Sequence, residues 1–273
     1  MPPPPPPPPP PQKQAQKTLT ILLTGFGPFV RISDNPSWSI VETLLSSGPL
    51  TIRTPSTLYT IHLLPHPSAI KVSYATIDAL VPSLWETGTR AWDYVLHIGV
   101  GREGGFKLER RAWVDGYVLR DVDGRFPGDG GVGDGVGKGE GKGKGKGEGE
   151  GKGEEKGVEM KGVHGGEQAL PLDERPGRQL YTALDVEAIA KFVGESVTAK
   201  EDATLVDIVA SGDPGMFLCG YTFRASLLEA EKRGEEERAR VLFLHVPPKG
   251  KRYGVDTGVD VVLKVVEGMD RTG

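Results

Sequence analysis

The sequence predicts an α/β protein, a single-domain α/β/α sandwich with a mostly parallel or mixed central sheet. Short apolar runs rich in β-branched residues alternate with stretches of helical periodicity along most of the chain. The parts of the chain that lack this alternation are two low-complexity segments. Excluding them leaves roughly 210 residues, which is enough for one domain with a sizeable hydrophobic core.

The predicted elements alternate from the N-terminus onward. Thr18–Thr24 is an apolar, β-branched run that ends at Gly25, which is typical of a buried strand. Asp34-Asn35-Pro36 then offers capping residues and a proline suited to a first helical turn. The full prediction consists of strands over 18–24, 58–64, 92–99, 204–210 and 241–245, and helices over 34–48, 68–85, 183–197, 222–235 and 256–267.

Active sites in such folds form where loops leave the carboxyl ends of the strands. Several turn-forming or catalytic residue types lie at predicted strand ends, so these ends could meet at one edge of the sheet. They are Gly25, Gly99, Ser211 and His245.

Two segments are predicted to lie outside the folded core. Residues 1–17 are a disordered, proline-rich tail in which Pro2–Pro11 would adopt polyproline II, a conformation that SH3- or WW-type grooves bind. At about 128–166, glycines alternate with seven lysines and eight acidic residues, whose charges nearly cancel. We interpret this stretch as a disordered surface insertion into the domain formed by residues 18–273.

Composition argues against several classes of partner. The net charge of −4 gives no reason to expect binding to nucleic acid or to an anionic membrane. No apolar stretch approaches the roughly 18 residues that a membrane span needs, and no signal-peptide core follows the proline run. A single cysteine permits no intrachain disulfide, which is compatible with a reducing cytosol, so we expect a cytoplasmic protein.

The only cysteine in the sequence, Cys219, is the leading candidate for catalysis. It lies between a predicted strand and a predicted helix, where the positive end of the helix dipole favours a thiolate. His245 ends another apolar run. A cysteine nucleophile and a histidine base are the two side chains that a cysteine hydrolase needs at least. The alternative is that Cys219 is a small buried hydrophobic residue without a chemical role.

Neither a metal nor a cofactor is predicted. Gly99-Val-Gly-Arg-Glu-Gly104 matches the dinucleotide pattern G-x-G-x-x-G, with Asp121 about 20 residues beyond it. However, Gly105 disfavours the helix that such a site requires. His97 is interpreted as a residue that either packs in the core or supports the site residues from behind. The histidines without metal-ligand spacing are His62, His66 and His164.

Four sequence blocks in a fixed order give the most specific functional signal. They are Thr24-Gly-Phe-Gly-Pro-Phe29 with Asn35-Pro-Ser-Trp38, Val95-Leu-His-Ile-Gly-Val100 with Leu108-Glu-Arg110, Ser211-Gly-Asp-Pro-Gly-Met-Phe-Leu-Cys219, and Leu244-His-Val-Pro-Pro248. Together they resemble the type I pyroglutamyl peptidases (pyrrolidone-carboxylate peptidases). They follow the order of that family and cover nearly the whole predicted core.

The resemblance implies a catalytic triad of Cys219, His245 and Glu109. In such a triad Cys219 attacks the acyl carbon, His245 carries the proton, and Glu109 orients the imidazole. The resemblance also implies that Phe26 and Phe29 line a pocket for the pyroglutamyl ring. The expected activity is removal of an N-terminal pyroglutamyl residue from peptides through a thioester acyl-enzyme.

The chain departs from the family pattern close to the expected site. Gly220 follows the cysteine where Asn or Asp is common, Val114 stands where Asn is typical, and Pro214 replaces an Ala. These changes could weaken the oxyanion region or a hydrogen bond between strands. The alternatives are therefore a catalytically weak or inactive relative that acts as a binding protein, or a hydrolase for a different amide.

Overall fold

The centre of the computed structural model is a seven-stranded sheet, and a second sheet has two strands. The structure describes residues 15–29, 32–46, 50–53, 57–66, 68–86, 92–129, 177–250 and 252–272. The strands of the large sheet are β1 (Ala15–Gly25), β2 (Leu50–Arg53), β3 (Thr57–Pro65), β4 (Tyr94–Val100), β5 (Phe106–Glu109), β8 (Ile208–Ser211) and β9 (Val241–Val246). The small sheet consists of β6 (Arg111–Trp113) and β7 (Gln179–Tyr181).

The large sheet is mixed and mostly parallel, as the sequence predicts. Its strand order is β2-β3-β1-β4-β9-β5-β8, and the four strands from β3 to β9 run parallel to one another. β5 pairs antiparallel with β9 and parallel with β8, while β2 is an antiparallel edge strand. The direction of the chain therefore reverses between β9 and β5.

This reversal corrects one expectation about the strand ends. Gly25, Gly99 and His245 lie at the same edge, because their strands are parallel and in register. Ser211 ends β8, which runs against β9, so its strand end faces the opposite edge. The prediction that all four ends could meet is wrong for Ser211.

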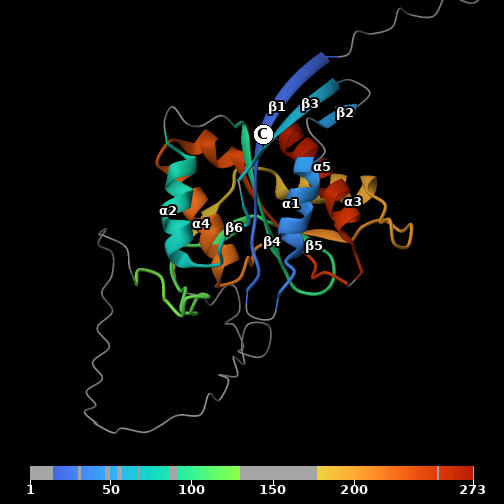
Figure 1. Cartoon of the computed structure of the whole chain (residues 1–273). Coiled ribbons are helices and arrows are strands. Elements are labelled where there is room, and N and C mark those ends of the chain that lie inside the picture. Colours follow the sequence, from blue (N-terminus) through green and yellow to red (C-terminus); the bar gives the residue numbers. More distant parts are fainter. Residues whose placement is uncertain are drawn as a thin grey trace, which may run out of the picture. The chain divides into compact units, whose positions relative to one another are not determined.

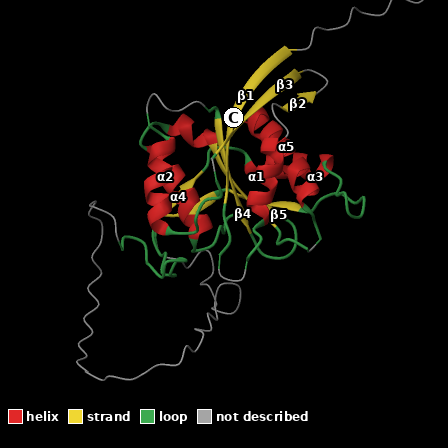
Figure 2. Ribbon diagram, in the orientation of Figure 1, coloured by secondary structure: helices red, strands yellow, loops and turns green. Residues whose placement is uncertain are grey.

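Helices cover both faces of the large sheet, which confirms the predicted α/β/α arrangement. α1 (Pro36–Ser46), α3 (Val186–Ser196) and α5 (Val255–Thr272) pack on one face, and α2 (Tyr74–Leu84) and α4 (Leu218–Glu231) pack on the other (Figures 1 and 2). A 3-10 helix, Glu235–Arg240, connects α4 to β9. Each face has its own apolar cluster, and successive residues of a strand alternate between the two.

Two predicted helix boundaries are wrong for local reasons. The sequence predicts a helix from residue 68, but α2 begins at Tyr74 because Ile70 forms a parallel bridge with Phe26. Ser73 then caps α2 by accepting a hydrogen bond from the backbone of Thr76. The helix expected from residue 222 begins at Leu218, which places the cysteine inside its first turn.

Some sequence predictions fall beyond the part of the chain that the structure describes. These are residues 1–14 of the predicted tail, including Pro2–Pro11, residues 130–166 of the predicted insertion, and His164. Residues 15–17, which the sequence prediction includes in the disordered tail, instead begin β1 by pairing with β3. On either side of the interval 130–176, β6 and β7 pair antiparallel, with Ala112 opposite Leu180. Both strands pack against α4. Within the described ranges, no helix combines the length and the apolar character needed to cross a membrane.

Candidate active site

Glu109 and His245 meet on the sheet face that α2 and α4 cover. Leu244 points into the apolar cluster on the other face, so the next residue of β9, His245, points toward α4. Glu109 pairs with Phe243 across the antiparallel β5–β9 ladder and therefore shares the face of His245. The Nδ1 of His245 lies 2.8 Å from the Oε1 of Glu109.

Cys219 approaches the same imidazole from the first turn of α4. Its side chain lies close enough to His245 to be the group that most raises the pKa of the imidazole. A Cβ added to Gly99 would lie 3.0 Å from the Sγ of Cys219, so this glycine leaves room for the thiol. Because Glu109 engages Nδ1, the nitrogen of His245 that remains for Cys219 is Nε2. The structure thus brings together the three side chains that the resemblance implies as a triad.

Burial and charge act in opposite directions on His245. Burial disfavours the imidazolium, but the Cys219 thiolate and the Glu109 carboxylate outweigh burial and raise the pKa of His245 to about 9. Glu109 is fully buried, and its Oε2 has no hydrogen-bond partner among the described residues. A buried carboxylate that is only partly hydrogen-bonded depends on a nearby counter-charge. The site therefore favours a protonated His245.

His97 is a packing residue, which is one of the two interpretations from the sequence. Its Nδ1 lies 2.7 Å from the Oγ1 of Thr24, and its Nε2 lies 2.6 Å from the Oγ of Ser226. Burial lowers the pKa of His97 to about 3, so the ring is neutral at ordinary pH. A neutral imidazole donates one hydrogen bond and accepts the other. His97 therefore connects β1 and β4 to α4, the helix that carries Cys219.

The glycine-rich turn after β4 serves this site and not a dinucleotide. A Cβ on Gly101 would lie 3.0 Å from the Cβ of His245, and one on Gly105 would lie 2.3 Å from the backbone oxygen of Asp207. The chain continues from Gly105 directly into β5, and no helix follows the turn to hold a pyrophosphate. Close packing against His245 and Asp207 accounts for the glycines that resemble a nucleotide motif.

The two predicted pocket phenylalanines have different environments. Phe26 is almost fully buried in the cluster beneath α2 and α4. Phe29 is partly buried, and the centre of its ring lies 6.2 Å from that of Phe217. No sequence pattern predicts Phe217 as a pocket residue. It is the N-cap residue of α4 and precedes Cys219 by two positions. An aromatic residue so close to a candidate nucleophile is the signal that could have identified it.

The structure accommodates two of the departures from the family pattern. The backbone of Val114 makes two hydrogen bonds: its N–H donates to the carbonyl of Arg178 over 2.8 Å, and its carbonyl accepts from the Nε of Arg224 over 2.5 Å. Its side chain packs against the apolar cluster beneath α2 and α4, where an Asn would place a polar group. A Cβ on Gly220 would lie 2.1 Å from the backbone oxygen of Gly215. Glycine at position 220 therefore lets the preceding turn pack directly on α4.

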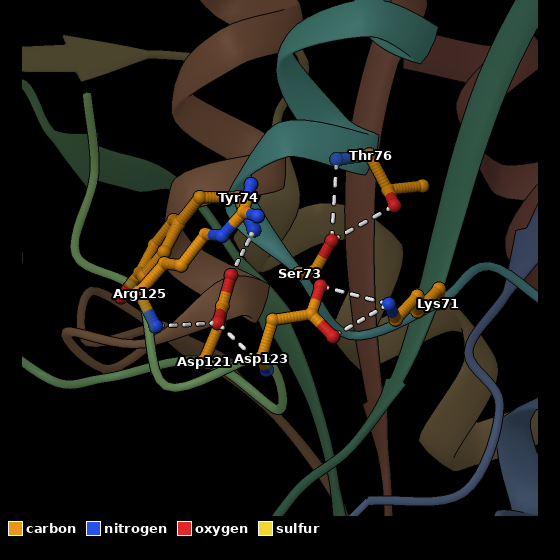
Figure 3. Close-up of polar contacts among 7 residues, drawn as sticks. All are labelled: Lys71, Ser73, Tyr74, Thr76, Asp121, Asp123 and Arg125. Carbon is orange, nitrogen blue, oxygen red and sulfur yellow. Dashed lines mark hydrogen bonds and ion pairs between the residues drawn. The ribbon is translucent and has the colours of Figure 1, made fainter. Parts of the chain in front are cut away.

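A surface hollow of about 560 Å³ lies elsewhere, over the N-terminal half of α2. Beside it, the Asp121 carboxylate accepts from the backbone N–H groups of Tyr74, Asp123 and Arg125, and Lys71 pairs with Asp123 (Figure 3). These contacts fix the loop around residues 121–125 to the start of α2. No predicted site residue lines the hollow. In the described ranges, no group of three His, Cys, Asp or Glu side chains could hold a metal ion.

Comparison with known proteins supports the pyroglutamyl peptidase family, as the four sequence blocks predict. No family model matches the chain. It is 26% identical over 258 residues to pyroglutamyl-peptidase 1 of Mus musculus, which covers 93% of this chain and 91% of the relative. Pyroglutamyl-peptidase 1 of Homo sapiens is 25% identical over the same length.

Solved structures support the fold independently. Pyroglutamyl peptidase I from Bacillus amyloliquefaciens matches 92% of this chain and 95% of its own with a TM-score of 0.55 at 18% identity. Pyrrolidone carboxyl peptidase from Thermococcus litoralis matches 92% of this chain and 94% of its own with a TM-score of 0.54, also at 18% identity. The likeness extends over almost the whole of each chain.

Proposed function

We propose that this chain is a cysteine-type omega peptidase that hydrolyses the N-terminal pyroglutamyl residue from peptides. The observation that carries the proposal is the convergence of Glu109, His245 and Cys219 from β5, β9 and α4. The buried Glu109 and His245 are 2.8 Å apart, and the partly buried Cys219 is close enough to raise the pKa of His245. The similarity to named pyroglutamyl peptidases over 93% of the chain gives the substrate class.

Cys219 is the proposed nucleophile and His245 the proposed acid–base. The Sγ of Cys219 attacks the carbonyl carbon of the pyroglutamyl residue, and the scissile C–N bond then breaks. The proton held by His245 passes to the departing amine, which leaves as the shortened peptide. A water molecule, deprotonated by the now neutral His245, hydrolyses the thioester and regenerates the Cys219 thiolate with an imidazolium.

Glu109 holds the imidazole in a single orientation through Nδ1 and stabilises its protonated form. The oxyanion would be bound by backbone N–H groups at the start of α4. The N-cap residue of this helix, Phe217, offers no side-chain acceptor to them. These amides are therefore not taken up by a side-chain cap and are available to a carbonyl oxygen of the substrate.

The proposed ring pocket involves Phe29 and Phe217, with Phe26 beneath them in the core. The rings of Phe29 and Phe217 are neighbours, and Phe217 precedes Cys219 by two positions at the start of α4. A pyroglutamyl ring is a compact neutral lactam whose methylene groups suit contact with aromatic rings. We propose that Phe26 acts by supporting the loop that carries Phe29.

The decisive experiment is hydrolysis of a fluorogenic pyroglutamyl amide by purified protein. Wild type should release the fluorophore, whereas Cys219→Ala should keep its fold and release none. The matching glutamyl amide, which has no lactam, should remain uncleaved. Full activity in folded Cys219→Ala would eliminate the proposal, and equal cleavage of the two amides would eliminate the proposed substrate class.

We further propose that the protein acts in the cytoplasm, which is supported by its single cysteine and its cysteine-dependent chemistry. The SH3- or WW-type contact of Pro2–Pro11 stays a prediction from the sequence. A pull-down with and without residues 2–11 would test it.

A further inference from the structure

The residues that follow Glu109 in the chain, Arg110 and Arg111, contact the stretch of chain that precedes Cys219. β5 ends at Glu109, and the next residue, Arg110, donates its backbone N–H to the carbonyl of Ser211 over 2.8 Å. Ser211 ends β8 and leads into the loop 212–217 that precedes α4. The proposed acid, Glu109, is therefore only one residue away from a contact with the chain that leads to Cys219.

The side chain of Arg111 holds the first residue of that loop. Its Nε donates to the carbonyl of Gly212 over 2.9 Å, and its Nη1 donates to the Oε1 of Gln179 over 2.8 Å. A Cβ on the buried Gly212 would lie only 3.0 Å from this Nε, so the glycine admits the guanidinium. Arg111 thus links β6, β7 and the loop before Cys219 through one planar group.

The chain beyond Arg111 continues alongside the segment that carries Cys219. Contacts recur at every fourth residue along 212–224, on both sides of the cysteine. The pairs are Gly212 with Arg111, Met216 with Gly116, Gly220 with Tyr117, and Arg224 with Val114. The segment 111–117 therefore supports the loop before Cys219 as well as the first turns of α4.

We propose that Arg111 is a positioning residue that sets the place of Cys219 relative to His245 by holding the carbonyl of Gly212. The inference rests on the proposed cysteine-dependent hydrolysis. Arginine suits this role because its rigid fork presents two donors to two acceptors at once, which a lysine ammonium does not reproduce. The side-chain hydrogen bonds of Arg111 lead to Gly212, Gln179 and Tyr181, and to none of the three triad side chains.

The neighbouring Arg110 provides a matched control. Its guanidinium pairs with Glu187 on the surface, where both side chains are about half exposed, at 49% and 58%. The backbone contact of Arg110 with Ser211 survives replacement of the side chain. A Cβ on Gly212 would lie 3.3 Å from the Nε of Arg110, so both arginines are near this glycine, but only Arg111 hydrogen-bonds its carbonyl. Removing the Arg110 guanidinium therefore changes the local charge as much as removing that of Arg111 and leaves the hydrogen bond to Gly212 in place.

The test compares Arg111→Met and Arg111→Lys with Arg110→Met in the full-length protein. Two quantities are measured: kcat and KM for the pyroglutamyl amide, and the rate of Cys219 alkylation by iodoacetamide across a pH series. We expect Arg111→Met to lower kcat by roughly ten- to a hundredfold with KM nearly unchanged, since a shift of ~1 Å between reacting groups can cost that much. Its alkylation profile should move to higher pH, because a displaced thiolate loses part of the stabilisation by His245.

Arg111→Lys should fall between wild type and Arg111→Met, and Arg110→Met should match wild type in both measurements. Gln179→Leu is a milder variant that loosens the guanidinium without removing it, and it should lower kcat in the same direction. If Arg111→Met does not fold, an unchanged kcat in Gln179→Leu overturns the proposal.

The outcomes separate this inference from the proposed function. Coincident alkylation profiles for the Arg111 and Arg110 variants overturn the positioning role, whatever the hydrolysis rates. If wild type fails to cleave the amide while the alkylation profile of Arg111→Met is shifted, the positioning role stands and the proposed substrate is wrong.

Discussion

The two faces of the central sheet carry different chemistry at the same level of the strands. On the face covered by α1, α3 and α5, the strands β1, β4, β5 and β9 contribute Leu23, Ile98, Leu108 and Leu244. On the face covered by α2 and α4, the adjacent residues of the same strands are Thr24, His97, Glu109 and His245. All eight side chains are buried. The same four strands therefore build core on one side and a polar site on the other.

Successive side chains of a strand point to opposite faces of the sheet. Here the side chains on one face stabilise the fold, and those on the other face form the candidate site. Apolar side chains stabilise the fold in proportion to the area that they bury, whereas buried polar groups need specific partners. Thr24 and His97 are satisfied by hydrogen bonds, but one oxygen of Glu109 has no hydrogen-bond partner within the part of the chain that the structure describes. A slip of one residue in any of these strands would exchange the two faces.

The largest expected effect comes from Glu109→Gln, which removes the charge from the polar face. We expect kcat for the pyroglutamyl amide to fall about 10⁴-fold, as when the acid of another triad becomes an amide. The pKa of His245 should also fall, because Glu109 is one of the groups that raise it. Steady-state kinetics and NMR titration of the imidazole check the two effects separately.

The control for this change is a buried glutamate on the other side of the sheet. Glu267 in α5 is 1% exposed and pairs with Lys264 and Arg271. Glu267→Gln should lower stability and leave kcat of the folded protein unchanged. Equal losses of kcat in the two variants would show that the polar face has no special role.

Leu244→Ala attacks the apolar face directly behind the site. Leu244 is fully buried, so we expect a loss of about 2–5 kcal/mol in the free energy of unfolding. The folded fraction should keep its kcat, because His245 points away from the cavity that forms. Urea unfolding measured beside kinetics at low temperature tests this separation, and a large drop in kcat of folded protein would contradict it.

Gly99→Ala tests the close packing over the nucleophile. The new Cβ would lie 2.8 Å from the ring of Phe243 and 3.0 Å from the Sγ of Cys219, so we expect kcat to fall about tenfold through displacement of the thiol. Gly268→Ala is the counterpart in α5, where the Cβ would meet Ile189 at 2.9 Å. It should cost about 1–3 kcal/mol of stability and no activity. A loss of activity in Gly268→Ala, with unchanged activity in Gly99→Ala, would contradict the placement of the active site on the face that α2 and α4 cover.

The smallest expected effect is a pH dependence of stability that comes from the polar face. His245 has its pKa raised from 6.5 to about 9, so its contribution is complete below pH 6.5 and is lost as pH rises through about 9. Thermal unfolding at a series of pH values should show this loss in wild type. Cys219→Ala should flatten it, since the thiolate is the largest of the raising causes. An unchanged slope would mean that the two side chains do not interact.

Local patterns in the sequence identify much of the site but not its acid. Cys219 lies between a predicted strand and a predicted helix, and His245 ends an apolar run, so each has a signal in its own stretch of sequence. Glu109 has no such signal, because its neighbours Arg110 and Arg111 make it resemble a surface charge. Only the resemblance to a family singles it out. In the structure, β5 is a four-residue strand that buries Glu109 and directs Arg110 toward solvent-exposed Glu187.

The sequence by itself determined the α/β class, the identity of the candidate nucleophile and base, and the two segments that do not resemble a core. These properties depend on periodicity and composition over short windows. The tertiary structure alone decided that β5 and β8 run against β9, that α4 begins before Cys219, and that Arg111 reaches Gly212. Strand direction and side-chain contacts depend on pairings between residues as far apart as Glu109 and His245, and such pairings leave no trace in local sequence patterns.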